Sequence, residues 1–197
     1  MKIPLEKVRL DLARSYDKMG YYDNMKVSRP TLALVEAMLA SSNEPYFQLH
    51  VVLSFLRYLY LLHQTNHWTA SGDPYYGDHL LFERLYTATV EEIDAIGEKA
   101  VGLGSPHLVN LDSQLKSVML IQESNHRHYV IPRPDELVDS SLVAEATFLC
   151  SMKLICDSLK SDGLMTHGLD NLLAGIEDKH EGSLYLLKQR AQSTFMV

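Results

Sequence analysis

Apolar side chains recur every three or four positions along most of this chain, which is the spacing of one face of an α-helix. Short clusters of glycine, proline and small polar residues interrupt the pattern, and no two segments alternate strictly as paired strands do. The spacing predicts long helices over about 45–68, 76–101 and 134–159 and from Leu169 into the tail, with shorter ones over about 4–19, 28–39 and 111–122. Four long helices joined by short breaks are typical of an all-α four-helix bundle.

The segment 46–68 is apolar on most sides of its predicted helix. Its only interior formal charge is Arg57. A helix of this kind lies deep inside a bundle. We therefore divide the chain into an N-terminal helical extension, residues 1–44, and a bundle, residues 45–197.

The composition limits which classes of protein this chain could belong to. The chain has 197 residues, of which 46% are hydrophobic and 22% charged, enough to bury the core of one domain. No run approaches 18 uncharged apolar residues, and the first ten residues carry charges where a secretion signal needs an apolar segment. The two cysteines, Cys150 and Cys156, lie about 240° apart on one helix and cannot bond to each other. These features favour a cytoplasmic protein with no membrane partner.

Charge is distributed unevenly along the chain. Of the net charge of −7, residues 1–29 carry +3 and the remainder carries −10. An acidic body repels nucleic acid, so DNA would be bound only through residues 1–29, with association at the nucleoid as the consequence. Acidic residues are interleaved in that arm and its apolar spacing suits a docked helix, so packing or assembly is the alternative role.

The segment 67–104 carries the most informative chemistry. On a helical wheel that starts at His79, Glu83 lies at roughly 40°, Asp94 at roughly 60° and Glu98 at roughly 100°. The apolar residues of the segment fall between roughly 240° and roughly 340°. Potential metal ligands therefore form a stripe beside the core face, and His67 ends the preceding helix close to the turn that leads back. The alternative is a solvated acidic face with two surface histidines.

Distance along the helix limits how these ligands can act. The midpoints of the His79/Glu83 and Asp94/Glu98 pairs are 15 residues apart, or about 22 Å. One metal cannot reach both pairs in one chain. If two copies of the helix pack antiparallel across a two-fold axis, each histidine pair faces the other chain's carboxylates. The spacing therefore predicts two equal intersubunit sites.

Segment 67–104 also resembles Dps, the DNA-protection-during-starvation branch of the ferritin-like proteins. The family pattern begins with a His-Trp pair, followed by a Gly five residues after that His and a second His twelve residues after the first His. A Phe-acid-x-x-Tyr motif comes next, and an Asp-x-x-Ala-Glu-Arg motif followed by Leu-Gly ends the pattern. The matching positions are His67-Trp68, Gly72, His79, Phe82-Glu83, Tyr86, Asp94, Glu98 and Leu103-Gly104. The resemblance is specific over this segment and weaker over the last two helices.

The resemblance implies a ferroxidase site shared between subunits of a hollow shell, twelve in this family. His67, His79 and Glu83 would come from one chain, and Asp94 and Glu98 from its neighbour. Imidazole and carboxylate ligands suit Fe(II). Paired Fe(II) would be oxidised, in this family preferentially by hydrogen peroxide, ferric oxide would collect inside the shell, and DNA would be protected from oxidative damage. The alternative is a DNA-binding or particle-structural protein with the same fold.

Two departures from this pattern bear on the predicted site, and a further residue lies beside it. Glu83 stands where the family commonly has Asp, so its carboxylate reaches one methylene further. Gly97 costs about 1 kcal/mol relative to Ala in a helix interior, which close approach of two backbones at the dimer axis would explain. Trp68 is adjacent to the site; in the family this residue is thought to take up oxidising equivalents, and a core aromatic is the alternative.

Other histidines are assigned structural roles. We expect His63 to be a buried structural histidine, with a third imidazole of the metal site as the alternative, and His50 to be structural or exposed. His126 and His128 lie in a predicted loop that could bind a transition metal.

Glu177 and His180 have the Glu-x-x-His spacing that forms half of the di-iron motif found inside ferritin-like bundles. That motif also needs a carboxylate from the first bundle helix, and residues 46–68 contain none. An exposed helix face is therefore the default expectation for this pair, and a di-iron oxygen-activating enzyme is the weakest hypothesis.

Overall fold

The computed structural model describes residues 26–125 and 133–193, and every regular element in these ranges is helical. The elements are α2 (Arg29–Ser41), α3 (Phe47–Thr69), α4 (Tyr75–Leu103), the 3-10 turn η2 (Pro106–Val109), α5 (Leu111–Asn125), α6 (Pro134–Ser161) and α7 (His167–Ser193). The all-α prediction is confirmed, and each predicted helix in the described ranges is present within three residues of its expected bounds. The predicted helix over 4–19 lies outside the described residues.

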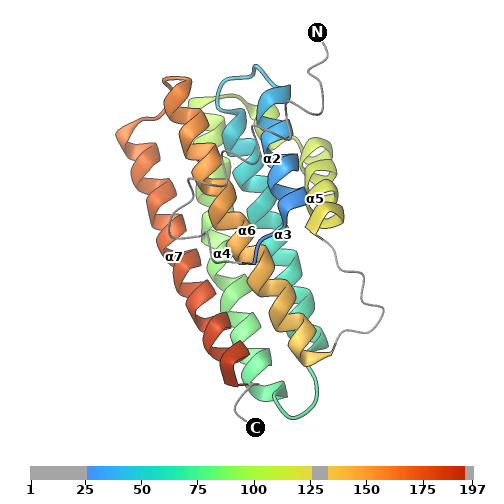
Figure 1. The fold of residues 1–197 in the computed structure, drawn as a ribbon. Helices are drawn as coiled ribbons and strands as arrows, with labels where there is room; N and C mark the ends of the chain where they lie inside the picture. Colours follow the sequence, from blue (N-terminus) through green and yellow to red (C-terminus); the bar gives the residue numbers. More distant parts are fainter. Residues whose placement is uncertain (1–25, 126–132, 194–197) are drawn as a thin grey trace.

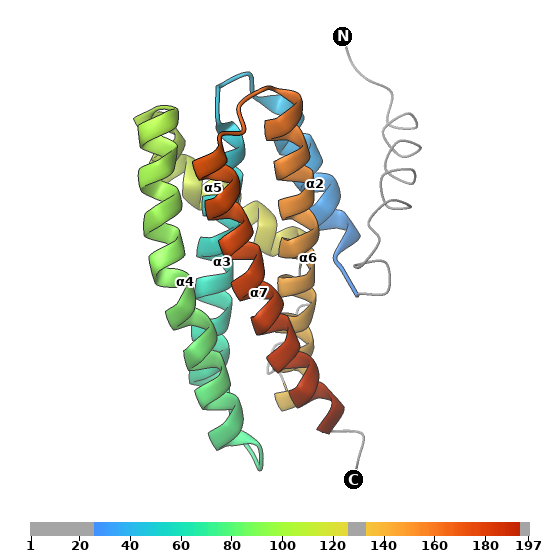
Figure 2. The ribbon, with the colours of Figure 1, turned by 90° about the vertical axis from the view of Figure 1, so that its left-hand side faces the viewer.

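Helices α3, α4, α7 and α6 form the bundle (Figures 1 and 2). Around this ring α3 packs against α4, α4 against α7, α7 against α6, and α6 against α3. Helices α2 and α5 lie outside the ring; α2 packs against α6, α5 and α3, and α5 also packs against α3. The four-helix bundle predicted from the apolar spacing is therefore the observed architecture.

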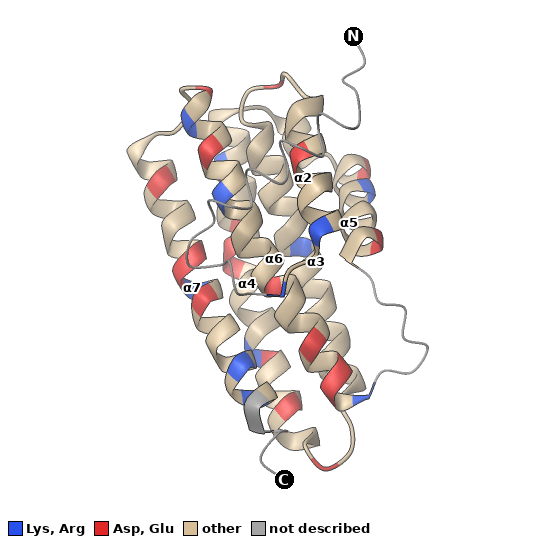
Figure 3. Ribbon diagram, in the orientation of Figure 1, with Lys and Arg blue, Asp and Glu red and all other residues tan. Residues whose placement is uncertain are grey.

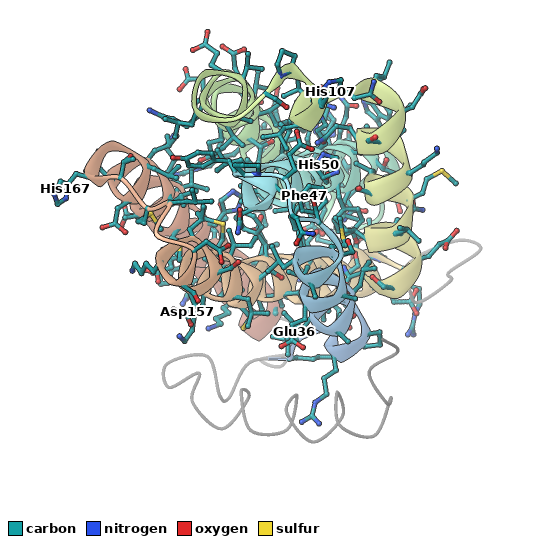
Figure 4. The ribbon with its side chains drawn as sticks, turned by 90° about the horizontal axis from the view of Figure 1, so that it is seen from above. Glu36, Phe47, His50, His107, Asp157 and His167 are labelled. Carbon is teal, nitrogen blue, oxygen red and sulfur yellow. The ribbon has the colours of Figure 1, made fainter. Side chains whose placement is uncertain are left out.

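Helix α3 lies in the middle of the molecule. Seen along the bundle, it is enclosed by α4, α2, α5 and the α6–α7 pair (Figure 4). Its apolar residues from Leu49 to Leu59 are buried in the main core, with Phe55 packed against Phe148 of α6 at a ring-centroid distance of 5.3 Å. This position explains why α3 is apolar on most sides.

The helix ends follow the local signals in the sequence. The Ser28 side chain accepts a hydrogen bond from the Thr31 amide and caps α2, as its position before Pro30 suggests. Helix α4 continues through Gly102 and ends at Leu103, with Gly104 as its C-cap. A side chain at Gly104 would come within 2.6 Å of Leu108 and 3.0 Å of the Ala100 carbonyl oxygen, so this close approach requires glycine.

One ion-pair cluster joins three helix termini at the end of the bundle where the α3–α4 turn lies (Figure 1). Arg190, near the end of α7, binds both oxygens of the buried Asp78 in the first turn of α4, at 2.5 and 3.0 Å. Its guanidinium also lies 3.7 Å from Asp135 at the start of α6. This bidentate pair fixes the beginning of α4, where His79 is the next residue.

The remaining surface features are consistent with the composition. Acidic and basic positions are mixed along α6 and α7 (Figure 3). None of the helices in the described ranges is long and apolar enough to span a membrane. Cys150 and Cys156 form no disulfide within the described residues.

Candidate functional site

The two histidines singled out by spacing lie against each other. His67 is in the last turn of α3 and His79 is in the second turn of α4, and the turn between them contains Gly72 with a left-handed φ of 76°. Their imidazole rings stack with centroids 3.7 Å apart and planes 24° apart. The fold therefore brings this predicted pair into one place.

The hydrogen bonds of this pair determine which ring nitrogens carry protons. Nδ1 of His67 lies 2.8 Å from the His79 carbonyl oxygen, and Nδ1 of His79 lies 3.0 Å from the His67 carbonyl oxygen. A carbonyl oxygen can only accept, so each Nδ1 must donate a proton. In the neutral rings both Nε2 atoms then keep their lone pairs, which is the form of imidazole that binds a metal.

Aromatic side chains surround the histidine pair. Tyr86 packs edge-on against His67 at 5.4 Å, and Tyr75 lies 5.1 Å from His79. Trp68 is 68% exposed. The core-aromatic alternative for Trp68 is therefore wrong, because most of its side chain is exposed.

The predicted carboxylate ligands all lie on the exposed side of α4. Glu83 follows His79 by one helical turn, and Asp94 and Glu98 lie three and four turns further along. All three are exposed, whereas Phe82, Leu85 and Ile96 of the same helix are buried. Helix α4 thus has a stripe of exposed carboxylates beside its buried apolar stripe, and their role as metal ligands stays a prediction.

Within one chain these groups do not form a metal cage. No three His, Cys, Asp or Glu side chains in residues 26–125 and 133–193 are arranged to hold a metal ion. Helix α4 is continuous from Tyr75 to Leu103, so the separation of about 22 Å between the histidine end and the Asp94/Glu98 end persists in the fold. The structure brings His67, His79 and Glu83 to one end of α4 and leaves Asp94 and Glu98 far from them.

A second, unexpected set of polar side chains lies inside the bundle. Glu145 of α6 accepts hydrogen bonds from Nε2 of His63 at 2.8 Å and from Nδ1 of His180 at 2.6 Å. Nε2 of His180 in turn donates to Glu92 of α4 at 3.0 Å. Each of the four residues is at most 2% exposed. We call this set, His63, Glu92, Glu145 and His180, the interior cluster.

The interior cluster continues to a hydroxyl at its other end. The Ser141 hydroxyl accepts from the Asn66 amide at 2.9 Å and lies 3.3 Å from Nδ1 of His63. A carboxylate oxygen only accepts, so Nε2 of His63, which faces Glu145, carries a proton, and in the neutral ring Nδ1 accepts from the Ser141 hydroxyl.

Burial and neighbouring charges shift the pKa values of two members of the interior cluster in opposite directions. Burial alone raises the pKa of Glu145, but the charge of His180 and the hydrogen bonds from His180 and His63 outweigh it and lower that pKa to about 2. Burial alone lowers the pKa of His180, but the charge and hydrogen bond of Glu145, with the Glu92 contact, raise it to about 10. At neutral pH His180 is therefore an imidazolium between two carboxylates.

The expectation of an exposed face for Glu177 and His180 is wrong for His180, which is buried. Glu177 is half-buried and lines a separate pocket between α6 and α7 with Cys156 and Lys160. Burial and the nearby Glu181 raise the pKa of Glu177. The two residues therefore do not act as one motif, and the α3 side chain that contacts Glu145 is the imidazole of His63.

Core periodicity could have revealed the interior cluster. His180 continues the buried stripe Leu173, Ile176, Leu184 and Leu187 of α7, and Glu92 continues the buried stripe Phe82, Leu85, Thr89, Ile96 and Ala100 of α4. A charged or titratable residue on a core stripe needs a buried partner.

The remaining histidines that the sequence analysis named, His50, His63, His126 and His128, are either buried or outside the described residues. His63 is buried, as expected. His50 is 3% exposed, lies 2.9 Å from the Leu108 carbonyl oxygen and 3.0 Å from the Ser117 hydroxyl, and stacks on Phe47 (Figure 4). The structural role of His50 is thereby confirmed. His126 and His128 lie outside the described residues.

The interior cluster makes stability depend on pH in a defined direction. The raised pKa of His180 stabilises the fold below pH 6.5, and this contribution is lost as the pH rises toward about 10. The lowered pKa of Glu145 stabilises the fold above pH 4.5, and this contribution is lost as the pH falls toward about 2. The loss in unfolding free energy caused by H180Q should therefore be largest between pH 4.5 and pH 6.5, as measured by chemical denaturation.

The variant H50Q is the matched control, because burial lowers the pKa of His50. Its effect on the unfolding free energy should not decline above pH 6.5. An effect of H180Q that stays constant from pH 6.5 to 9 would contradict the assigned charge of His180.

Comparison with known proteins gives structural matches only. No protein-family model and no curated protein matches the sequence. Among solved structures, Dps from Thermosynechococcus elongatus is 17% identical, with 81% of this chain and 92% of that chain covered and a TM-score of 0.60. The Dps protein from Vibrio cholerae O1, described as a member of a broad superfamily of ferritin-like diiron-carboxylate proteins, is 17% identical, with 80% and 91% covered and a TM-score of 0.57. This chain therefore has the all-α, ferritin-like bundle fold of the Dps proteins.

Proposed function

We propose that this protein is an iron-oxidising and iron-storing mini-ferritin, with a ferroxidase site at each end of a two-fold dimer interface. One observation carries the proposal: the crossed hydrogen bonds of His67 and His79 direct a proton to each Nδ1, so in the neutral rings the lone pair of each Nε2 could bind a metal. Such fixed tautomers are characteristic of metal-binding histidines.

The ligand set favours iron as the substrate. The two imidazoles and Glu83 would come from one subunit, and Asp94 and Glu98 from its partner. Nitrogen and oxygen ligands together suit Fe(II), and the carboxylates favour the harder Fe(III) product. The description of the Vibrio cholerae Dps protein as ferritin-like diiron-carboxylate supports this choice of metal.

The reaction balances as a two-electron process with hydrogen peroxide as oxidant. Two Fe(II) ions give up one electron each, and the O–O bond of peroxide breaks as it accepts both. With water, the products are two ferric oxyhydroxide units and four protons. The exposed carboxylates Glu83, Asp94 and Glu98 would attract the cations and offset the charge that develops as iron is oxidised.

Storage and protection follow from the proposed assembly. A closed shell, of twelve subunits as the resemblance to Dps implies, would hold ferric oxide away from the cytoplasm. Consuming peroxide together with Fe(II) would protect DNA from oxidative damage. Of residues 1–29, only 26–29 are among the described residues, and a direct contact with DNA through this arm remains a prediction from its charge.

Removing single ligands should slow oxidation without unfolding the chain. H67A and E98A should each reduce the initial rate of peroxide-driven Fe(II) oxidation by about tenfold or more, because a metal site that loses a ligand binds and orients its ion poorly. The rate is measured by ferric absorbance after anaerobic loading. D178A, which removes an exposed carboxylate from α7, is the control and should oxidise iron at the wild-type rate. Wild-type rates in both ligand variants would exclude the assigned site.

Gly97 provides a test of the dimer interface that does not depend on iron. A Cβ at Gly97 or at Gly175 meets no atom within 4 Å in the single chain, so alanine should favour either helix by about 1 kcal/mol. If two α4 helices approach closely at Gly97, G97A should weaken association, whereas G175A on α7 should not. Sedimentation velocity across a concentration series measures the difference. Equal association of both variants would place Gly97 away from the interface.

A further inference from the structure

Arg57 is a charged residue that no contact within the chain explains. It is the only formal charge of the apolar helix α3, and its side chain is half-buried. Burial alone lowers the pKa of its guanidinium, and within residues 26–125 and 133–193 it forms no ion pair and no hydrogen bond. A guanidinium presents five donors suited to a carboxylate, so taking part of it out of water without such a partner costs free energy. A partner outside the chain would remove that cost.

Arg57 lies on a side of the bundle that is rich in exposed apolar side chains. Positions 57, 61, 64 and 68 share one face of α3 by helical spacing, and Leu61 and Trp68 are 48% and 68% exposed. Among the described residues, every exposed large apolar side chain except Tyr185 belongs to α3, α4 or α5. Helices α4 and α5 both pack against α3, so these side chains lie on neighbouring helices. A concentration of this kind marks a surface that contacts another protein.

The contacts between α3 and α4 give the level of Arg57 along the bundle. The stacked histidine pair and the edge-on contact between Tyr60 and Tyr86 are seven residues apart on both helices, in opposite directions along the chain. The two helices therefore run antiparallel, side by side, in a constant register (Figure 2). Three residues before Tyr60, Arg57 lies level with Thr89 of α4.

The proposed two-fold axis crosses α4 at the same level. The two ends of the ligand stripe are centred on residues 81 and 96, so an axis that exchanges them crosses the helix between Ala88 and Thr89. Arg57 of each subunit would then lie near the axis, and the two guanidinium groups would repel each other unless each met a carboxylate. This step rests on the proposed intersubunit site, because that site sets the position of the axis.

The direction of the Arg57 side chain selects the carboxylate. Helical side chains lean toward the N-terminus of their own helix, and for α3 this is the direction that leads from Thr89 toward Asp94 along α4. The axis places Glu83 of the partner subunit level with Asp94, about 8 Å along the bundle from Arg57. An arginine and a glutamate are long enough to meet across such an offset. Glu83 is exposed and, in the described part of the chain, forms no ion pair of its own.

We propose that Arg57 is an intersubunit anchor, which binds the carboxylate of Glu83 of the partner subunit on each side of the two-fold axis. The face is then self-complementary, as an isologous interface requires, because each subunit supplies one cation and one carboxylate. Arg57 is also a positioning residue for the shared site, since a ligand carboxylate that accepts from a neighbouring donor is fixed in its orientation.

Association of the metal-free chain tests this pair directly. R57A and E83A should each weaken association about tenfold in sedimentation experiments over a concentration series. The double variant R57A/E83A should lose no more than either single variant, because both substitutions remove the same contact. K153A, which removes a surface lysine that pairs with Asp157 within α6, is the matched control and should associate like the wild type.

Charge reversal provides a second test of the same pair. R57E places two carboxylates together and E83R two guanidinium groups, so each should weaken association further than alanine, whereas R57E/E83R should restore it. Far-UV circular dichroism verifies folding, and the alanine variants decide if R57E does not fold. In a wild type that dimerises, additive losses in R57A/E83A or no recovery in R57E/E83R would overturn the pairing alone. A wild type that stays monomeric at every concentration would overturn the proposed shared site as well.

Discussion

The continuity of helix α4 is the constraint on which the account of this protein depends. A rigid helix from Tyr75 to Leu103 holds its histidine end and its Asp94/Glu98 end about 22 Å apart. No side-chain rotation closes that distance. A metal centre made from both ends therefore requires a second copy of the chain, so the proposed iron oxidation depends on assembly of the dimer.

The same residue types serve two different roles according to burial. On the outer side of α4 the carboxylates are exposed and the histidines present lone pairs, so cations from solvent have access. Inside the bundle the carboxylates and imidazoles are at most 2% exposed and pair with one another. Access to solvent, rather than residue type, separates the two sets, so only the outer set fits the proposed binding of an ion that enters from solvent.

Periodicity and spacing predicted the helices and the exposed ligand stripe, because both depend on neighbours within one helix. The stacking of His67 on His79 was not predictable, because it depends on the turn that returns α4 beside α3. The interior cluster joins residues 35 to 88 positions apart, so no local pattern pairs them. Glu92 and His180 did carry a detectable signal, since each occupies an apolar position of a core stripe, where a titratable residue predicts a buried partner.

Complementation between two inactive chains tests the shared site most directly. One variant lacks the histidines, H67A/H79A, and the other lacks the distant carboxylates, D94A/E98A; each alone should oxidise Fe(II) no faster than buffer. After dissociation and statistical reassociation, half of the dimers are mixed, and each mixed dimer holds one site with all its ligands, so the mixture should recover roughly a quarter of the wild-type rate. A mixture as inactive as its parents, with mixed dimers verified by mass spectrometry, would contradict a site shared between subunits.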